Sequence, residues 1–342
     1  MRANSLPVLL WGAAVVAFVA VGTLCGPVYG ETVALTYSNV YPATHGNAIL
    51  AAEWAKEIEK RTNGAVKFQM FPGATLTPGD QCYDGVVKGI SDLGMSVLSY
   101  TKGRFPLSEV IDLPLGYRSG YQATRLANAF YKKFKPKEFD DVQVMYLMAH
   151  GPGILHTKEK PVSKMEDLKG MKIRCSGTSS KVVKALGATP VAMPQPDTYE
   201  ALSKGVVEGV VSPVEVLKGW KFADVVKYTT NNLGSAYTLG FFVVMNKKKW
   251  ESLPKDVQAA IEKVNEEWIE KSAKNWDVMD KEGKDHSLSK GNKFIDLTKE
   301  EDTRWAKTVR PVLDEYVQET KAKGLPGDDA LKFCLEWLKN NQ

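Results

Sequence analysis

Alternating strand and helix patterns near the start of the sequence are the feature that most constrains the fold. Residues 33–38 and 66–71 alternate apolar and polar side chains as strands do, and residues 47–61 carry apolar side chains at helical spacing. A second helix is expected near residues 80–88, followed by a short strand at residues 93–96. This strand–helix–strand–helix order predicts an α/β fold, in which helices cover parallel sheets.

An internal repeat indicates that this pattern occurs twice. Residues 83–96 match residues 199–212 at a constant offset of 116, through a Tyr, an acid, a Lys-Gly pair, a second acid and a final Ser. Each copy predicts a helix ended by Gly and then a strand, which carries Ser96 or Ser212 at its carboxyl end. Two common helix–strand units could match by chance. Two related lobes would instead direct both serines to one cleft, because ligands bind beyond the carboxyl ends of such strands.

Length and charge narrow the class of protein. A chain of 342 residues is too long for one ordinary core and suits two domains. The formal net charge is only +5, and the basic residues do not gather on one predicted element. We therefore expect no nucleic-acid partner.

The first thirty residues differ from the rest of the chain. Arg2 is their only charged residue, and residues 6–24 form an apolar stretch. This pattern predicts a signal peptide, residues 1–30, that is cleaved near Gly30. An uncleaved anchor is the alternative, because the apolar run is long for a signal peptide. Cys25 is a weaker candidate for a lipoprotein site, since Leu24 before it is large.

Residues that carry chemistry are sparse. The sequence has four His and, after the signal peptide, three Cys, and neither set has the spacing of a metal site. A serine-hydrolase elbow, a phosphate-binding loop and a dinucleotide fingerprint are all absent from the sequence. His150 follows a strand-like segment and is expected to be a buried or rim residue. We expect neither a metal nor a cofactor.

Arg174 is the exception. It lies in a strand-like segment, residues 171–175, that gives way to a helix start at residues 176–180. A guanidinium is always charged, and its rigid fork of donors matches a carboxylate. The free N–H groups of a helix start also favour anions. Arg174 could instead pair with a neighbouring acid or point to water, and spacing alone leaves this open.

A long helix is expected from residue 255 to about residue 287, because the segment lacks Pro and has an apolar face. Such a helix would span more than one lobe. Gly283 could break it. A short amphipathic helix is expected at residues 331–338.

From residue 32 to about residue 338, the chain resembles the extracytoplasmic solute-binding proteins of tripartite ATP-independent periplasmic (TRAP) transporters, the family of C4-dicarboxylate and sialic-acid binders. The resemblance rests on "AAEWAKEIEKRTNGAVKFQMFPGATL", "VVKGISDLGMS", "VIDLPLGY", "MEDLKGMKIR" and "MPQPDTYEALSKGVVEGVVSP", in this order. It implies a two-lobed α/β clamp, like other periplasmic binding proteins, with a long helix bridging both lobes. We expect lobe I at residues 31–151 with 238–278, and lobe II at residues 152–237 with 279–342.

The resemblance also implies the ligand site. The family's carboxylate-binding arginine ends the "LKGMKIR" stretch and so corresponds to Arg174. Sialic-acid binders carry a second arginine about twenty residues earlier, where this chain has Gly153-Ile154-Leu155 with only His156 nearby. The other expected ligand-binding residues are Asn39, Tyr41, Ser96, Tyr100, Gly177, Gln195, Ser212 and Glu215.

The function implied is capture of an organic acid in the periplasm and its delivery to TRAP membrane subunits, without catalysis. With one arginine and several aromatic rings, an aromatic monocarboxylate is favoured over a dicarboxylate. A secreted enzyme on the same fold is the alternative, and Glu215 with His156 is the one acid–base pair that the sequence offers. A sensor ligand-binding module is a third reading.

Overall fold

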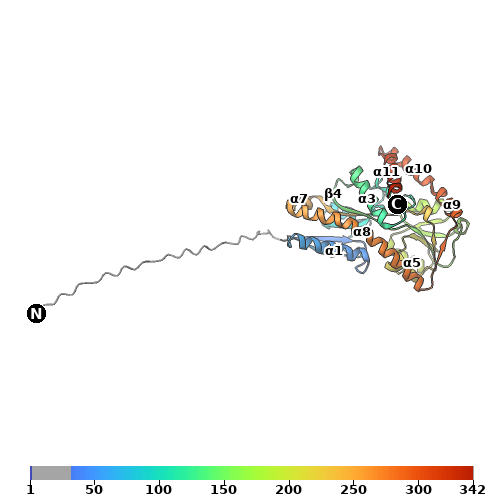
Figure 1. Cartoon of the computed structure of the whole chain (residues 1–342), viewed down its shortest axis with the longest axis horizontal. Helices are drawn as coiled ribbons and strands as arrows, with labels where there is room; N and C mark the ends of the chain where they lie inside the picture. Colours follow the sequence, from blue (N-terminus) through green and yellow to red (C-terminus); the bar gives the residue numbers. More distant parts are fainter. Residues whose placement is uncertain (2–31, 342) are drawn as a thin grey trace. The chain divides into compact units, whose positions relative to one another are not determined.

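Two β-sheets organise the part of the chain that the structure, a computed structural model, describes: Met1 and residues 32–341 (Figure 1). Residues 2–31 are not among the described residues. The predicted signal peptide, residues 1–30, therefore lies outside the described part except for Met1. Within the described part, no helix is both long and apolar enough to span a bilayer.

The first sheet has five strands and forms the core of the first lobe. Its strands are β1 (Val33–Asn39), β2 (Val66–Phe71), β3 (Leu93–Val97), β4 (Val142–Ala149) and β10 (Gly240–Asn246). They lie in the order β2-β1-β3-β10-β4, with β1 parallel to β2 and β3, and β10 antiparallel to β3 and β4. The strands predicted at residues 33–38, 66–71 and 93–96 are confirmed to within a residue.

Helices cover both faces of the first sheet. They are α1 (Gly46–Arg61), α2 (Cys82–Val87), α3 (Gly120–Phe134) and α7 (Lys247–Ser252). Strand β10 shows the two faces, since Phe241 packs in the same cluster as Trp54 of α1, whereas Phe242 packs with Phe130 of α3. A strand buried on both faces is apolar throughout, which explains the run Phe241–Met245.

The second sheet has six strands and repeats the pattern of the first. Its strands are β5 (Ile154–Thr157), β6 (Lys172–Cys175), β7 (Thr189–Ala192), β8 (Gly209–Ser212), β9 (Tyr228–Asn231) and β11 (Lys293–Asp296). In the order β7-β6-β8-β5-β9-β11, β6 is parallel to β7 and β8, and β5 is antiparallel to β8 and β9. The two copies of the repeat end in β3 and β8, which hold equivalent places. This match agrees with two related lobes.

Short helices flank the second sheet. They are α4 (Ser179–Ala185), α5 (Gln195–Ser203) and α6 (Val216–Gly219). Single 3-10 turns occur in both lobes: η1 (Leu98–Tyr100), η2 (Ser108–Asp112), η3 (Lys137–Phe139), η4 (Met165–Leu168), η5 (Phe222–Asp224) and η6 (Leu233–Ser235).

Helix α8 (Lys255–Ser289) crosses both lobes, as predicted (Figure 1). It packs against α1, α3 and β4 of the first lobe and against α6 of the second. Gly283 does not break it. A Cβ at Gly283 would lie 2.3 Å from the carbonyl oxygen of Val214, so glycine allows the helix to approach the second lobe closely.

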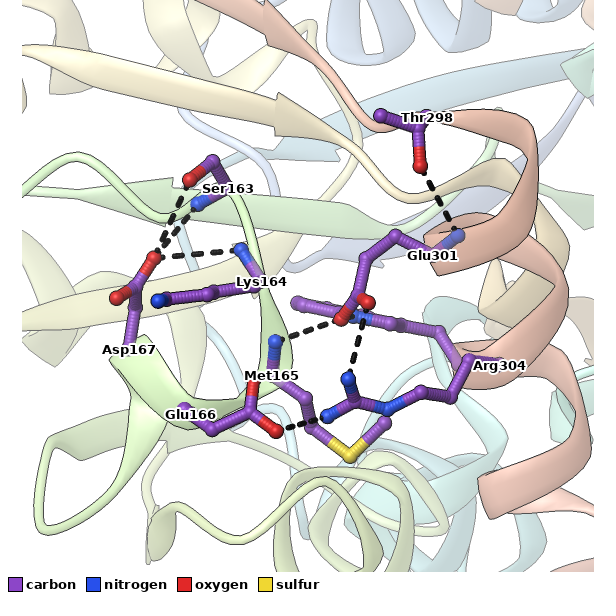
Figure 2. A network of polar contacts seen from close by, with 9 residues as sticks. Ser163, Lys164, Met165, Glu166, Asp167, Thr298, Glu301 and Arg304 are labelled. Carbon is purple, nitrogen blue, oxygen red and sulfur yellow. Dashed lines mark hydrogen bonds and ion pairs between the residues drawn. The ribbon is translucent and has the colours of Figure 1, made fainter.

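Helix α9 (Lys299–Val309) is fixed to the second lobe by a polar network at η4 (Figure 2). Glu301 accepts hydrogen bonds from Met165 N and Trp305 Nε1, both at 2.8 Å, and Arg304 pairs with Glu166 and Glu301. Exposed ion pairs of this kind contribute at most about 1 kcal/mol each. The buried Trp305 ring adds apolar contact at the same place.

The last two helices are α10 (Pro311–Ala322), which contacts both lobes, and α11 (Gly327–Asn340), which returns to the first lobe. In α10, Tyr316 Oη donates to the Leu107 carbonyl at 2.8 Å. Helix α11 packs on α3 and shares a buried cluster with it. The expected assignment of residues 279–342 to the second lobe therefore does not hold for α11. Periodicity gives a helix an apolar face without saying which lobe that face covers.

Candidate ligand-binding site

Arg174 lies near the end of β6 and is buried, with 2% of its surface exposed. Its Nε and one terminal nitrogen, Nη2, donate to the Met193 carbonyl at 3.1 and 2.8 Å. Within residues 32–341, Arg174 forms no ion pair with an acid, and Nη1 has no hydrogen-bond partner. A buried guanidinium without a counter-charge is costly. The arrangement favours an anion from outside the chain.

A cavity lies beside Arg174, where the two lobes meet. Residues from both lobes and from the connections between them line it: Val40, Tyr41, Val97, Tyr100, His150, Arg174, Gln195, Ser212, Pro213, Glu215, Val216, Trp220, Leu239, Phe241 and Trp276. Arg174 is the only Arg or Lys among these residues.

Six of the nine residues predicted for the site line this cavity: Tyr41, Tyr100, Arg174, Gln195, Ser212 and Glu215. The other three do not. Asn39 Oδ1 accepts from Tyr41 N at 2.9 Å and so holds the loop that carries Tyr41. Ser96 Oγ donates to the Gly79 carbonyl at 2.7 Å.

Gly177 marks a close approach of the two lobes. Its φ is +52°, and a Cβ there would lie 2.4 Å from Ser99 Cβ in the first lobe. Nearby, the backbone N–H of Gln195 donates to Tyr100 Oη across the lobes at 2.9 Å. The lobes are therefore in contact at the edge of the cavity.

Aromatic rings form one side of the cavity. Phe241 lies at the centre of this set, with its ring centroid 5.9 Å from Tyr41 and 5.6 Å from Trp276. Trp220 lies 6.2 Å from Tyr41. Rings at these separations attract one another and present a large apolar surface. Neither Trp220 nor Trp276 was predicted as a site residue. By its spacing, Trp276 belongs to the apolar face of the long helix.

His150 was expected to be a buried or rim residue, and it lines the cavity as a buried one. Its Nδ1 lies 2.5 Å from the Gly151 carbonyl. Burial, and to a smaller extent the nearby charge of Arg174, lower the pKa of His150 to about 4. The imidazole is therefore neutral at pH 7.

Glu215 is held in a buried network at the edge of the cavity. Its Oε2 lies 3.1 Å from His45 Nε2, and the His45 ring stacks on Tyr41 at 4.3 Å. Its backbone N–H donates to Asp280 of α8 at 2.8 Å. Burial first, and then the Glu215 charge, raise the pKa of Asp280 to about 8.

The acid–base pair that the enzyme reading required does not form. His156 contacts Thr229 Oγ1 at 2.9 Å and the Ser212 carbonyl at 3.1 Å, while Glu215 is paired with His45. Burial also lowers the pKa of His156 to about 4. His156 therefore serves as a structural contact between strands.

Comparison with known proteins agrees with this geometry. Residues 37–320 match the family described as bacterial extracellular solute-binding protein, family 7, named DctP. The chain belongs to this family. The C4-dicarboxylate-binding periplasmic protein DctP of Rhodobacter capsulatus is 27% identical over 313 residues, which cover 87% of this chain and 90% of the relative.

Solved structures of TRAP solute-binding proteins share the fold. One from Desulfovibrio salexigens is 35% identical with a TM-score of 0.80, and the match covers 90% of this chain and 95% of that one. Another, from a marine metagenome and specific for aromatic acid ligands, was solved with metahydroxyphenylacetate. It is 28% identical with a TM-score of 0.86, and the match covers 90% of this chain and 99% of that one. The chain is thus a two-lobed TRAP solute-binding protein, and its family comprises binding proteins rather than enzymes.

Proposed function

We propose that this protein captures an organic acid in the cavity between its lobes and delivers it to TRAP membrane subunits. The observation that carries the proposal is the buried Arg174, which faces a cavity and lacks an acidic partner within the described residues. A bidentate carboxylate would supply the missing charge and the missing acceptors. Tyr100, Gln195 and Ser212 line the same cavity and add polar groups, and Glu215 at its edge is paired with His45.

The preferred ligand is a monocarboxylate with an aromatic body. Tyr41, Phe241 and Trp276 offer ring faces, and Arg174 is the only Arg or Lys among the cavity-lining residues described. A second carboxylate would be buried against these rings without a strong partner, which is costly. The marine metagenome relative that is specific for aromatic acids supports this choice. The R. capsulatus relative is named as C4-dicarboxylate-binding, so a C4-dicarboxylate is the competing candidate ligand.

Capture is coupled to closure of the lobes. We assign residues 31–151 with 238–278 to lobe I, and residues 152–237 with the segment from 279 through α9 to lobe II. Helix α11 lies with lobe I, and α10 contacts both lobes. The connections at residues 150–153 and 232–239 join the lobes together with α8, and Gly153 bridges Tyr237 between them.

The apolar N-terminal stretch supports export. We propose that residues 1–30 are a signal peptide that is removed near Gly30, and that the mature protein works in the periplasm. Mass spectrometry of the protein purified from a periplasmic extract would give the first residue directly. A chain that keeps residues 1–30 would contradict cleavage.

A thermal-shift screen followed by calorimetry tests the ligand class. An acid at a hundred times its dissociation constant stabilises the folded protein by about 2.7 kcal/mol. Phenylacetate or a similar aryl acid should bind at least about tenfold tighter than succinate, a difference of about 1.4 kcal/mol. Succinate binding about tenfold tighter than aryl acids would overturn the aromatic preference. Absence of binding by any carboxylate would overturn the function.

A further inference from the structure

Three residues that line the cavity each carry a buried polar atom with no hydrogen-bond partner among residues 32–341: His150 Nε2, Gln195 Nε2 and Trp276 Nε1. Together with Arg174 they are the polar groups of the cavity that still lack a partner or a counter-charge. Gln195 Nε2, Trp276 Nε1 and the guanidinium are all donors. A buried polar atom that stays unpaired costs free energy, so each should find its partner on the ligand.

His150 differs from the other three because its free nitrogen is an acceptor. The Gly151 carbonyl can only accept a hydrogen bond, so His150 Nδ1, at 2.5 Å, carries the ring proton. The ring is neutral at pH 7, since burial and the charge of Arg174 both oppose a second proton. His150 Nε2 therefore presents a lone pair to the cavity.

A carboxylate cannot satisfy this atom. Its two oxygens only accept, so they suit Arg174, Gln195 and Trp276 and would repel the lone pair of His150. An ammonium group would donate to His150, but it would be buried close to Arg174, and its natural counter-charge, Glu215, is already paired with His45. A neutral hydroxyl has the required donor without the charge.

We propose that His150 Nε2 accepts a hydrogen bond from a ligand hydroxyl, and that the site selects aryl acids with this hydroxyl beside the carboxylate, the 2-hydroxy acids. The position beside the carboxylate follows because His150 and Arg174 line the same cavity and the charge of Arg174 acts on the His150 ring. This inference rests on the proposed function, and it adds a specificity-determining residue and a narrower ligand class.

Three acids of nearly equal size separate the alternatives. Mandelate carries the hydroxyl, phenylglyoxylate carries a keto oxygen at the same carbon, and phenylacetate carries neither group. Calorimetry with the wild-type protein at pH 7 should show mandelate binding about tenfold or more tighter than phenylacetate, with phenylglyoxylate the weakest. The keto oxygen of phenylglyoxylate would be repelled by the lone pair of His150 Nε2, whereas phenylacetate only leaves that nitrogen without a partner.

Two variants test the role of the nitrogen. His150→Leu removes the acceptor and should bring mandelate and phenylacetate within about threefold of each other. His150→Gln keeps an acceptor, the amide oxygen, at a similar reach and should retain part of the mandelate preference. The glutamine amide can also donate a hydrogen bond, so phenylglyoxylate should bind more tightly to this variant than to the wild-type protein. Phenylacetate affinity and the melting temperature report whether each variant is folded.

The outcomes separate the two proposals. Equal wild-type affinity for mandelate and phenylacetate would overturn the hydroxyl inference and leave carboxylate capture intact. An unchanged mandelate preference in His150→Leu would overturn the role of His150. Failure of all three acids to bind, while succinate binds, would overturn the aromatic ligand class and the inference with it.

Discussion

The two lobes contribute different chemistry to one cavity. The first lobe supplies mainly apolar and aromatic side chains, among them Val40, Tyr41 and Phe241, whereas the second supplies the charged and polar Arg174, Gln195, Ser212 and Glu215 together with one ring, Trp220. All five strands of the first sheet have a counterpart in the second, in the order β7-β6-β8-β5-β9, so this division comes from side chains rather than topology. It suggests an order of events, in which the carboxylate binds the second lobe and the rings of the first lobe then close over the ligand body.

The internal repeat shows the same difference between the lobes at one pair of equivalent residues. Ser96 and Ser212 end equivalent strands, yet Ser96 donates to Gly79 inside the first lobe while Ser212 lines the cavity. Equivalent backbone places therefore carry different roles. The predictions below test this division, from the largest expected effect to the smallest.

Removal of the Arg174 guanidinium should have the largest effect. Arg174→Ala removes the charge that holds the carboxylate, and breaking a buried ion pair costs roughly 3–5 kcal/mol, a few hundredfold or more in affinity. Arg174→Lys should also lose much of the affinity, because an ammonium lacks the fork. Calorimetry checks both variants. If Arg174→Ala bound an aryl acid with an affinity within about threefold of wild type, Arg174 would not be the residue that holds the carboxylate.

Trimming a ring of the first lobe should weaken aryl acids selectively. Phe241→Leu removes ring contact with the ligand body and should cost about 1 kcal/mol, or about fivefold in affinity. Phe242→Leu is the matched control, since Phe242 is buried on the opposite face of the same strand, in the cluster with α3. That control should lower the melting temperature and leave affinity unchanged. Equal affinity losses in both variants would argue against a ring wall.

Closure should be sensitive to Gly177. An alanine there would place Cβ against Ser99 across the lobes, so Gly177→Ala should favour the open form. Gly187→Ala is the control, because Gly187 also has a positive φ, +90°, but nothing within 4 Å of its Cβ position. Each variant should lose about 1 kcal/mol of stability. Only Gly177→Ala should weaken binding and reduce the ligand-dependent decrease in radius of gyration, measured by X-ray scattering.

The two repeat serines should give the smallest effects. Ser212→Ala should reduce affinity by a few fold at most, through loss of about 0.5–1.5 kcal/mol of hydrogen bonding to the ligand. Ser96→Ala should leave affinity unchanged and lower stability by about 1 kcal/mol, because the Gly79 carbonyl loses its donor. The reverse pattern would show that the repeat brings both serines to the ligand.

Local sequence patterns predicted the elements well because they depend on neighbouring residues. Helix α8 follows from a long apolar stripe without Pro, whereas a strand that ends at a helix start only made Arg174 a candidate, and the family resemblance implied its role. His150 and Trp276 were not predicted as cavity residues, because their role depends on where the lobes meet. Ser96 was assigned to the site because its strand end is equivalent to that of Ser212, but the rotamer that turns it toward Gly79 depends on a loop distant from it in sequence.

The position of β10 has a consequence for how the chain acquires its structure. This strand lies between β3 and β4, yet it follows the strands β5–β9 of the other lobe in the sequence. A nascent or truncated chain that stops before Gly240 would leave β3 as an open edge of the sheet and β4 without its partner strand, and open edges promote aggregation. Contacts between segments far apart in sequence also slow folding. The sheet of the first lobe is therefore completed only after strands β5–β9 of the second lobe have been made.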